Sequence, residues 1–479
     1  MTQGILPYKY EEEKKSAGLT SMAGLPLYLE MAYALGLPES IERHLALRPS
    51  QGWTDSQMIL SLVLLVLAGG DCVDDLKILT ADEGFCRILE HIGPEAASSR
   101  WRTRKSCTVP SPSSVFRYLA AFHTNAVSVK GTASVSRTAA LAGLTCINRD
   151  LAAAIQRTTP SSTATLDMDA TLVETAKKDA LFCYEGYRAY QPLNVFWAEQ
   201  ELIVHSEFRD GNVPASYDLL RVLKETLDGL PEGITKVRLR ADAAGYSHDL
   251  LAYCDRGEDT RFGRIDFAIS CPVTEAFKKE VRTVTEWKRL DTRREWAEVC
   301  FVPNELGHSR KGPSYRYLAI REVLRQPVLP GMDLPFPTLD HGGTQYKLHG
   351  LVTNMDWAGE RLIALAYERC GKSEEAHAIM KDDLAGGKFP SGSFGENAAW
   401  WQIMVLAFNL NMAMKKLALG TSWVAKRMKA IRFSLINLPG RIIEHARLLT
   451  IRLVRNHPSF ALLVAARQRI KGLIPAPSG

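Results

Sequence analysis

Apolar side chains recur at helical spacing through the first 125 residues of the chain. The clearest runs are 25–35 and 58–67, followed by a shorter one at 73–79, and strand-like alternation is nearly absent. The longest apolar run, 58–68, is too short to cross a bilayer and predicts a buried helix. The N-terminal region is therefore expected to be helical.

The period changes from helical to extended after 158–162, a polar stretch typical of a linker. Alternating runs predict strands, and the amphipathic runs between them predict helices. Strands are expected at 163–166, 193–197, 201–206, 237–241 and 266–270, and helices at 217–227 and 247–253. Antiparallel strands followed by strand, helix and strand indicate an α/β fold.

Beyond 271 the pattern is less regular. Strand-like segments at 299–302 and 315–320 indicate a β-rich insertion, and helices are expected after a strand at 348–353. At 479 residues the chain is longer than a single compact core usually holds, so more than one structural part is expected. The expected parts are a helical N-terminal region at 1–157, an α/β domain in two pieces at 158–271 and 346–415, a β-rich insertion at 272–345, and a basic helical segment at 416–479.

Basic residues are concentrated at the C-terminus. The net charge is +6, but Glu444 is the single acidic residue among the last 69, against thirteen basic ones. The basic residues are Lys415, Lys416, Lys426, Arg427, Lys429, Arg432, Arg441, Arg447, Arg452, Arg455, Arg467, Arg469 and Lys471. This excess predicts a polyanionic partner. A membrane surface is least favoured, because Pro439-Gly440 and Pro458 interrupt any amphipathic face.

The nine cysteines are scattered, with no C-x-x-C pair and no histidine-rich neighbourhood. This distribution predicts reduced thiols rather than a zinc site. The N-terminus lacks the basic-then-apolar order of a signal peptide. We therefore expect a cytoplasmic protein.

Two carboxylates, Asp167 and Asp169, end the predicted strand that begins at Thr163. Alternate residues of a strand face the same side. Two like charges on one face repel each other unless a cation neutralises them, so the pair predicts a metal site. The alternative is an acidic turn at the end of a strand.

Two further stretches carry acidic side chains. Asp242 follows a predicted strand at its carboxyl end, where α/β folds build sites, although it could instead cap the next helix. Tyr367, Glu374 and Lys381 recur every seven residues and would share one stripe of a continuous helix. The alternatives are a solvated helix face or a helix broken at Gly371. Together, two Asp and a Glu can hold two Mg²⁺ about 3.5–4 Å apart for phosphodiester cleavage.

These motifs, in this order, resemble a known family. They are D-A-T at 169–171, R-A-D-A-A-G-Y at 240–246, and the Tyr, Glu and Lys series followed by F-G-E-N-A-A-W-W-Q-I-M-V-L-A-F-N-L. They resemble the DDE transposases of bacterial insertion sequences and, within these, the IS1380 group of the IS4-like superfamily. The resemblance covers most of the chain and implies an RNase H-like catalytic domain at 158–271 and 346–415.

The resemblance also implies roles for individual residues. Asp169, Asp242 and Glu374 would be the catalytic triad and the ligands of Mg²⁺, with Mn²⁺ tolerated. Asp167 is the reserve candidate, as a group that supports the ligands.

The superfamily carries a signature of Tyr, Arg, Glu and Lys with two, three and six residues between them. Tyr367, Glu374 and Lys381 match this signature, but its Arg position holds Cys370. The resemblance implies that Tyr367 and Lys381 contact DNA. Arg369 is the candidate substitute, although it would point about 100° away on a continuous helix.

The resulting hypothesis is a transposase that binds the terminal inverted repeats of its element, cleaves double-stranded DNA at the element ends and joins the 3′-hydroxyls to target DNA. The N-terminal helices and the basic C-terminal segment would contact DNA, and a homodimer would hold the two ends. The alternatives are a DNA-binding relative that has lost catalysis, suggested by Cys370, and a nuclease that cuts without joining.

Overall fold

The computed structural model describes residues 18–47, 52–92, 108–124, 138–303, 315–324, 334–446 and 448–474. The chain divides into two compact units. The first comprises Met1–Ala126, Ser136–Leu151 and Ile379–Gly479, and the second comprises Val127–Val135 and Ala152–Ala378. The helix α7 (Ala139–Thr158) runs from the first unit into the second.

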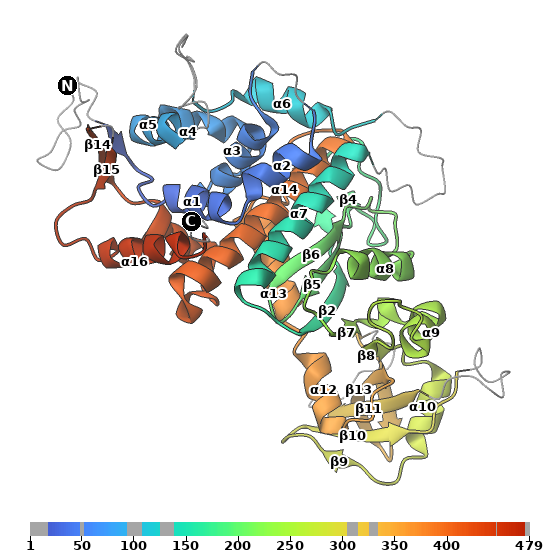
Figure 1. Cartoon of the computed structure of the whole chain (residues 1–479). Helices are drawn as coiled ribbons and strands as arrows, with labels where there is room; N and C mark the ends of the chain where they lie inside the picture. The colour runs from blue at the N-terminus through green and yellow to red at the C-terminus, as the bar shows by residue number, and fades with distance from the viewer. Residues whose placement is uncertain are drawn as a thin grey trace, which may run out of the picture. The chain divides into compact units, whose positions relative to one another are not determined.

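The second unit is built on a mixed β-sheet (Figure 1). Five neighbouring strands form its first half, in the order β6 (Leu202–Glu207), β5 (Leu193–Trp197), β2 (Thr163–Ala170), β7 (Lys236–Ala241) and β8 (Asp266–Cys271). β5 is antiparallel to both β6 and β2, whereas β7 is parallel to β2 and β8 is parallel to β7. In chain order these strands read 3-2-1-4-5, which is the arrangement of an RNase H-like sheet, and α8 (Leu219–Gly229) and α9 (His248–Arg256) connect its later strands.

Strands of the expected β-rich insertion at 272–345 continue this same sheet, but the strand expected at 299–302 is wrong, because the strand there ends at Val299. After α10 (Glu275–Arg282), the order runs on from β8 through β13, β11, β10 and β9, with β12 paired to β13. These strands are β13 (Thr344–Thr353), β11 (Arg316–Val323), β10 (Arg294–Val299), β9 (Lys288–Arg289) and β12 (Thr338–His341). They are therefore an extension of the central sheet. A small separate pair is formed by β3 (Val173–Glu174) and β4 (Ala189–Tyr190).

One face of the extended sheet is covered by α12 (Gly359–Tyr367), which Figure 1 shows beside β13 and β11. Leu362 and Ile363 of this helix pack in one buried cluster with Leu318, Leu351 and other apolar residues of the strands. The helix after it, α13 (Lys372–Ala378), follows a break at Gly371, whose φ of 91° ends the first helix. The packing of α12 thus fixes where the chain turns back toward β2.

The first unit is mainly helical, and two of its helices, α3 (Asp55–Ala68) and α14 (Phe394–Ala413), are almost entirely buried. Its central helix, α14, is buried around nearly its whole circumference and packs against α1 (Pro26–Ala34), α3 and α6 (Pro112–Ala120). The predicted apolar run forms α3, which starts at a capping box of Thr54 and Gln57 and is almost entirely buried. The helices of this unit are α1 (Pro26–Ala34), α2 (Leu37–His44), α3 (Asp55–Ala68), α4 (Leu76–Ala81), α5 (Glu83–Ile92), α6 (Pro112–Ala120), α14, α15 (Met428–Ile431) and α16 (Phe460–Lys471).

The expectation that the C-terminal segment is helical throughout is wrong. It contains two strands, β14 (Gly440–His445) and β15 (Leu448–Arg452), which pair with each other and, through β14, with β1 (Leu19–Thr20). Pro439 cannot continue the preceding helical turn. The β-branched residues after it then alternate on a ribbon whose partner strand comes from the distant N-terminal part of the chain.

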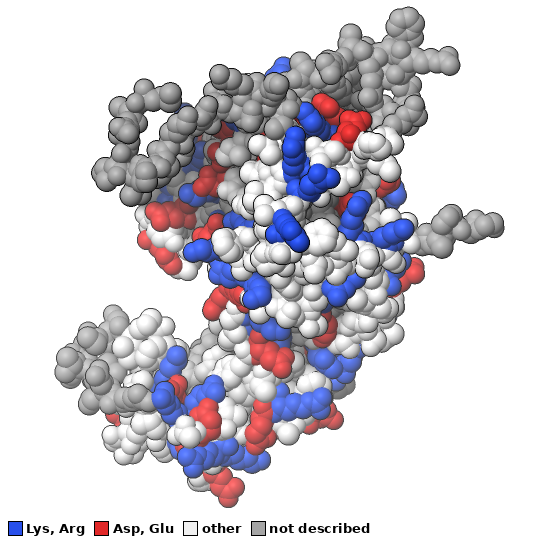
Figure 2. Space-filling model, turned by 90° about the vertical axis from the view of Figure 1, so that its left-hand side faces the viewer, with Lys and Arg blue, Asp and Glu red and all other residues white. Residues whose placement is uncertain are grey.

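Much of the basic character of this segment serves the internal structure of the first unit. Lys415 is buried and donates to the Val424 carbonyl, and Arg432 donates to the carbonyls of Val66 and Leu67. Arg427 forms a two-point ion pair with Asp383, at 2.7 and 3.0 Å. On the face drawn in Figure 2, basic and acidic side chains are interspersed. The charge excess in the sequence therefore overstates the number of cations available to a partner.

No single helix in the described part of the chain has the length and apolarity to cross a bilayer. The segments Asp55–Ala68 and Val73–Ala81 pass that test only as a joined pair, across a bend of 91°.

Candidate functional site

The two aspartates of the strand β2 and the aspartate after β7 lie at one edge of the sheet. Parallel pairing sets Asp167 opposite Arg240 and Met168 opposite Ala241, so Asp169 lies beside Asp242. Both strands end there, at their carboxyl ends, where α/β folds place functional side chains. The predicted proximity of Asp169 and Asp242 is thus a consequence of strand register.

Asp169 receives three groups from the segment between α12 and α13. Ser373 donates to Asp169 Oδ2 at 2.9 Å, Arg369 Nη1 lies 3.3 Å from the same oxygen, and His377 Nδ1 lies 3.9 Å from it. The expectation that Arg369 points away from the site assumed a continuous helix. Because the helix breaks at Gly371, Arg369 turns toward Asp169 instead.

The two aspartates carry negative charge in a poorly hydrated place. Burial raises the pKa of Asp169, and the nearby Arg369 guanidinium acts in the opposite direction. Burial also raises the pKa of Asp242, and the charge of Asp169 raises it further. One oxygen of Asp242 accepts from the Ala244 amide at 3.0 Å, so this carboxylate also caps the following turn, as one of the two interpretations predicted.

Glu374 lies on α13 with an exposed side chain, one residue after Ser373. At about 100° per residue it lies about 100° from Ser373 and about 60° from His377 around the helix axis. Glu375 lies about 160° from both of these residues and is directed away from Asp169. Of the two glutamates, Glu374 therefore lies nearer around the helix to Ser373 and His377, the residues of α13 that contact Asp169.

Asp167, the reserve candidate, forms a buried ion pair with Arg240. Both of its oxygens accept from the Arg240 guanidinium, at 2.6 and 2.8 Å, and the exposed fractions of the two side chains are 0% and 1%. Arg240 also donates to the Leu365 carbonyl at 2.8 Å and to Glu368 at 3.2 Å, at the end of α12. The pair therefore fastens β2 and β7 to the helix that leads to α13.

Tyr367 and Lys381 lie in different environments. Tyr367 packs against the apolar cluster under α12, with the Arg294 guanidinium 5.0 Å from its ring and the His349 ring 6.0 Å away. Lys381 lies in the π-helical turn Ile379–Asp383, which belongs to the first unit. The DNA contacts of these residues and of Arg369 stay predictions.

Several residues around the aspartates were not expected from the sequence. Arg240 precedes Asp242 by two residues, and the period of a strand could have placed both on one face. Ser373 and His377 are four residues apart, a spacing that puts both on one side of a helix. No sequence pattern indicated His349, whose ring lies 3.4 Å from Ser270 and whose pKa is lowered by burial and by Lys347 and Arg369.

The side chains whose possible metal-ligand atoms lie closest together are found elsewhere in the described structure. In the described residues, two groups bring three possible ligand atoms within 4.8 Å of one another, namely Asp71, Cys72 and Asp75, and His205, Glu207 and Glu225. The atoms of Asp169, Asp242 and Glu374 are not gathered this tightly.

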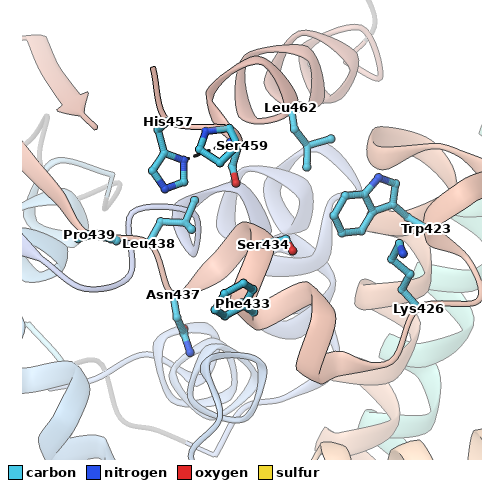
Figure 3. A pocket seen from close by; sticks show the side chains of 11 residues that line it. Trp423, Lys426, Phe433, Ser434, Asn437, Leu438, Pro439, His457, Ser459 and Leu462 are labelled. Carbon is cyan, nitrogen blue, oxygen red and sulfur yellow. Dashed lines mark hydrogen bonds between the residues drawn. The ribbon is translucent and has the colours of Figure 1, made fainter. Parts of the chain in front are cut away.

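The first unit contains an open cavity of about 600 Å³ formed by its C-terminal segments (Figure 3). Trp423, Lys426, Phe433, Asn437 and His457 are among its lining residues. Because no carboxylate lines it, this cavity does not offer a second set of ligands for Mg²⁺.

The chain is similar to a known transposase family in sequence and to a known transposase in structure. The cryo-EM structure of a piggyBac transposase synaptic complex with hairpin DNA is similar, with a TM-score of 0.43 and 11% sequence identity over 94% of this chain and 86% of that one. No curated protein matches the sequence. The family described as transposase DDE domain, group 1, matches residues 12–475. The chain therefore belongs to this family of DDE transposases.

Proposed function

We propose that this protein is an insertion-sequence transposase of the IS1380 group that binds the terminal inverted repeats of its own element, cleaves the DNA at the element ends and transfers the 3′-hydroxyls to target DNA. A DDE transposase domain implies phosphoryl transfer. The observation that carries the proposal is the position of Asp169 and Asp242 at the ends of two adjacent parallel strands, with the α13 segment against Asp169.

The donor set of this edge fits a divalent metal of the Mg²⁺ type. Asp169, Asp242 and Glu374 offer hard carboxylate oxygens, and Arg369 pairs with one of the two half-buried aspartates. These three residues would hold Mg²⁺ or Mn²⁺. Bound in a pair, such ions activate the attacking hydroxyl and stabilise the leaving oxygen of the phosphodiester.

The remaining residues of the site position these groups. Ser373 and Arg369 hold the Asp169 carboxylate, and the Asp167–Arg240 pair holds the two strands against the end of α12. Arg369 would meet a DNA phosphate once a cation replaces it at Asp169, together with Tyr367 and Lys381. In this role Arg369 would take the place of the signature Arg, whose position is occupied by Cys370.

The contact between Arg369 and Asp169 supports an active enzyme over a DNA-binding relative, because a guanidinium still reaches the carboxylates. A nuclease that cuts without joining would use the same residues. Double-stranded DNA and a second copy of the chain are the proposed partners, since two element ends must be held together, and the proposed location is the cytoplasm.

The decisive experiment is cleavage of a duplex that carries the flanks of the gene itself, in Mg²⁺, by the wild type and by Asp242→Asn, Glu374→Gln and Glu375→Gln. We expect cuts at the element boundary with the wild type and with Glu375→Gln, and none with the other two variants. Binding of the ends without any cut by the wild type would favour the DNA-binding relative. Cuts without joined products carrying a short target duplication would favour the nuclease.

A further inference from the structure

Asn194 of β5 lies in the same row of the sheet as Asp169. The register pairs Asp169 with Asn194 across β2 and β5, and Asn194 with Ser206 across β5 and β6. Directly opposite residues of antiparallel strands project from the same face of a sheet. Ser206, Asn194 and Asp169 therefore form a continuous row that leads from β6 to the aspartate edge.

The orientation of the Asn194 amide is set by Ser206. The Ser206 hydroxyl donates to Asn194 Oδ1 at 2.6 Å, which turns Oδ1 toward β6. The amide nitrogen lies on the other branch of the planar group and is turned away from Ser206, to the side of β2. The opposite assignment would direct Oδ1 at the negative Asp169, so electrostatics favours the same orientation.

This amide nitrogen is buried and lacks an acceptor. Asn194 is 2% exposed, and its Nδ2 has no hydrogen-bond partner in the described residues. A buried donor without an acceptor disfavours folding, and an apolar side chain of similar size would avoid this penalty. A polar group kept at such a position suggests a partner in another state of the site. The carboxylate next to it across the strand pair is Asp169, which here contacts Ser373 and Arg369.

We propose that Asn194 is a positioning residue for Asp169. Its Nδ2 donates to the Asp169 carboxylate when that carboxylate leaves Arg369 and binds a divalent cation, and Ser206 keeps the amide in the donating orientation. Hydrogen bonds of this kind fix the direction of a ligand oxygen and commonly change metal affinity by about 10–100-fold. The inference rests on the proposed function, because it requires Asp169 to be a metal ligand.

The test is a titration of the full chain with Mn²⁺, followed by electron paramagnetic resonance of the free ion, together with a thermal unfolding curve in the absence of metal. For Asn194→Leu we expect Mn²⁺ affinity to fall by about tenfold or more. The melting temperature of the metal-free protein should change little, because the change removes the unpartnered Nδ2 donor but also removes the acceptor of the Ser206 hydroxyl. A residue with a merely structural role would show the reverse, a lower melting temperature and unchanged affinity.

Two further variants make the result decisive. Gln191→Leu replaces another buried amide with an unpartnered atom, outside the Asp169 row, and should leave Mn²⁺ affinity unchanged. Ser206→Ala should lower the affinity less than Asn194→Leu does, and should add no further loss in the Asn194→Leu background.

The outcomes separate this inference from the proposed function. If Asp169→Asn abolishes Mn²⁺ binding but Asn194→Leu and Ser206→Ala both bind as the wild type does, the role of Asn194 is excluded and the metal site stands. If Asn194→Leu does not fold, unchanged affinity in Ser206→Ala overturns the inference. If Asp169→Asn itself binds Mn²⁺ normally, the proposed function fails first.

Discussion

The two faces of the central sheet each carry a cluster of acidic side chains, and the clusters differ in how their charge is neutralised. On the face of Asp169, the described ion pairs bring Arg369 and, at 3.9 Å, His377 to the half-buried Asp169, which lies beside Asp242. Successive residues of a strand alternate sides, so His205 and Glu207 of β6 project from the opposite face. There Glu207 pairs with both Arg209 and Arg221, and Arg221 also binds Glu225 and Asp218.

Under the proposed function, this difference separates a cluster that arginines neutralise from one that binds a cation. On the opposite face, Arg221 pairs with both Glu207 and Glu225, and oxygens of these carboxylates lie within 4.8 Å of each other and of a His205 nitrogen. On the Asp169 face the carboxylates lie further apart and keep a charge that the protein does not fully compensate. On the opposite face, tight convergence therefore reflects arginines that already pair with the carboxylates.

The largest expected effect is the loss of DNA cleavage when Asp242 is changed to Asn. Loss of one of the proposed metal ligands should lower the rate of Mg²⁺-dependent DNA cleavage by more than about 10–100-fold. A loss of that size is typical when a residue that only hydrogen-bonds a metal ligand is removed. The melting temperature should stay the same or rise, because a repulsive buried charge is removed. The matched change on the opposite face, Glu225→Gln, should keep the cleavage rate. Equal rates for the two variants would show that the faces do not differ as we describe.

The second expected effect is on stability, through Asp167→Asn. This change leaves the Arg240 guanidinium buried beside a neutral group and should lower the free energy of unfolding by about 3–5 kcal/mol. Unfolding in urea measures the effect. Asp169→Asn, two residues along the same strand, should not destabilise the protein. If both variants lose the same stability, Asp167 and Asp169 have equivalent structural roles and the distinction between them is wrong.

A third expected effect appears as a dependence on pH. The pKa values of Asp169 and Asp242 are raised in the folded protein, so the folded state holds these protons more tightly than the unfolded chain. Their contribution favours folding at low pH and is lost as pH rises through the raised pKa values. The stability of Asp169→Asn/Asp242→Asn relative to the wild type should therefore increase from about pH 4 upward and then level off. Urea unfolding of both proteins without divalent metal measures this difference, and a constant difference at every pH would contradict it.

The smallest expected effect concerns Arg369→Gln. Removing the guanidinium that competes for Asp169 should strengthen Mn²⁺ binding, by at most about fivefold, as for a partly hydrated ion pair. Arg221→Gln is the matched control on the opposite face and should leave Mn²⁺ binding unchanged. Weaker Mn²⁺ binding by Arg369→Gln would mean that Arg369 supports the ligands and does not compete with the metal.

Features set by neighbouring residues could be predicted from the sequence. The alternation of β2 placed Asp167 and Asp169 on one face, and the strand at 237–241 placed Asp242 at a carboxyl end. The apolar run of α3 correctly indicated a buried helix. These predictions hold because strand and helix periods depend on the local backbone alone. The order of the acidic motifs also sufficed to indicate the DDE transposases, which the family match supports.

The tertiary structure decided which of these residues interact. Asp167 and Asp169 are equivalent in the sequence pattern, but strand pairing gives Asp167 an arginine 73 positions away and gives Asp169 a neighbour at 242. The break at Gly371 brings Arg369 to Asp169, and the register of three strands places Asn194 between Ser206 and Asp169. The sequence by itself thus determined the kinds of elements and the chemical groups that they carry. Only the fold determined the partners, because an ion pair or hydrogen bond depends on which distant segments become neighbours.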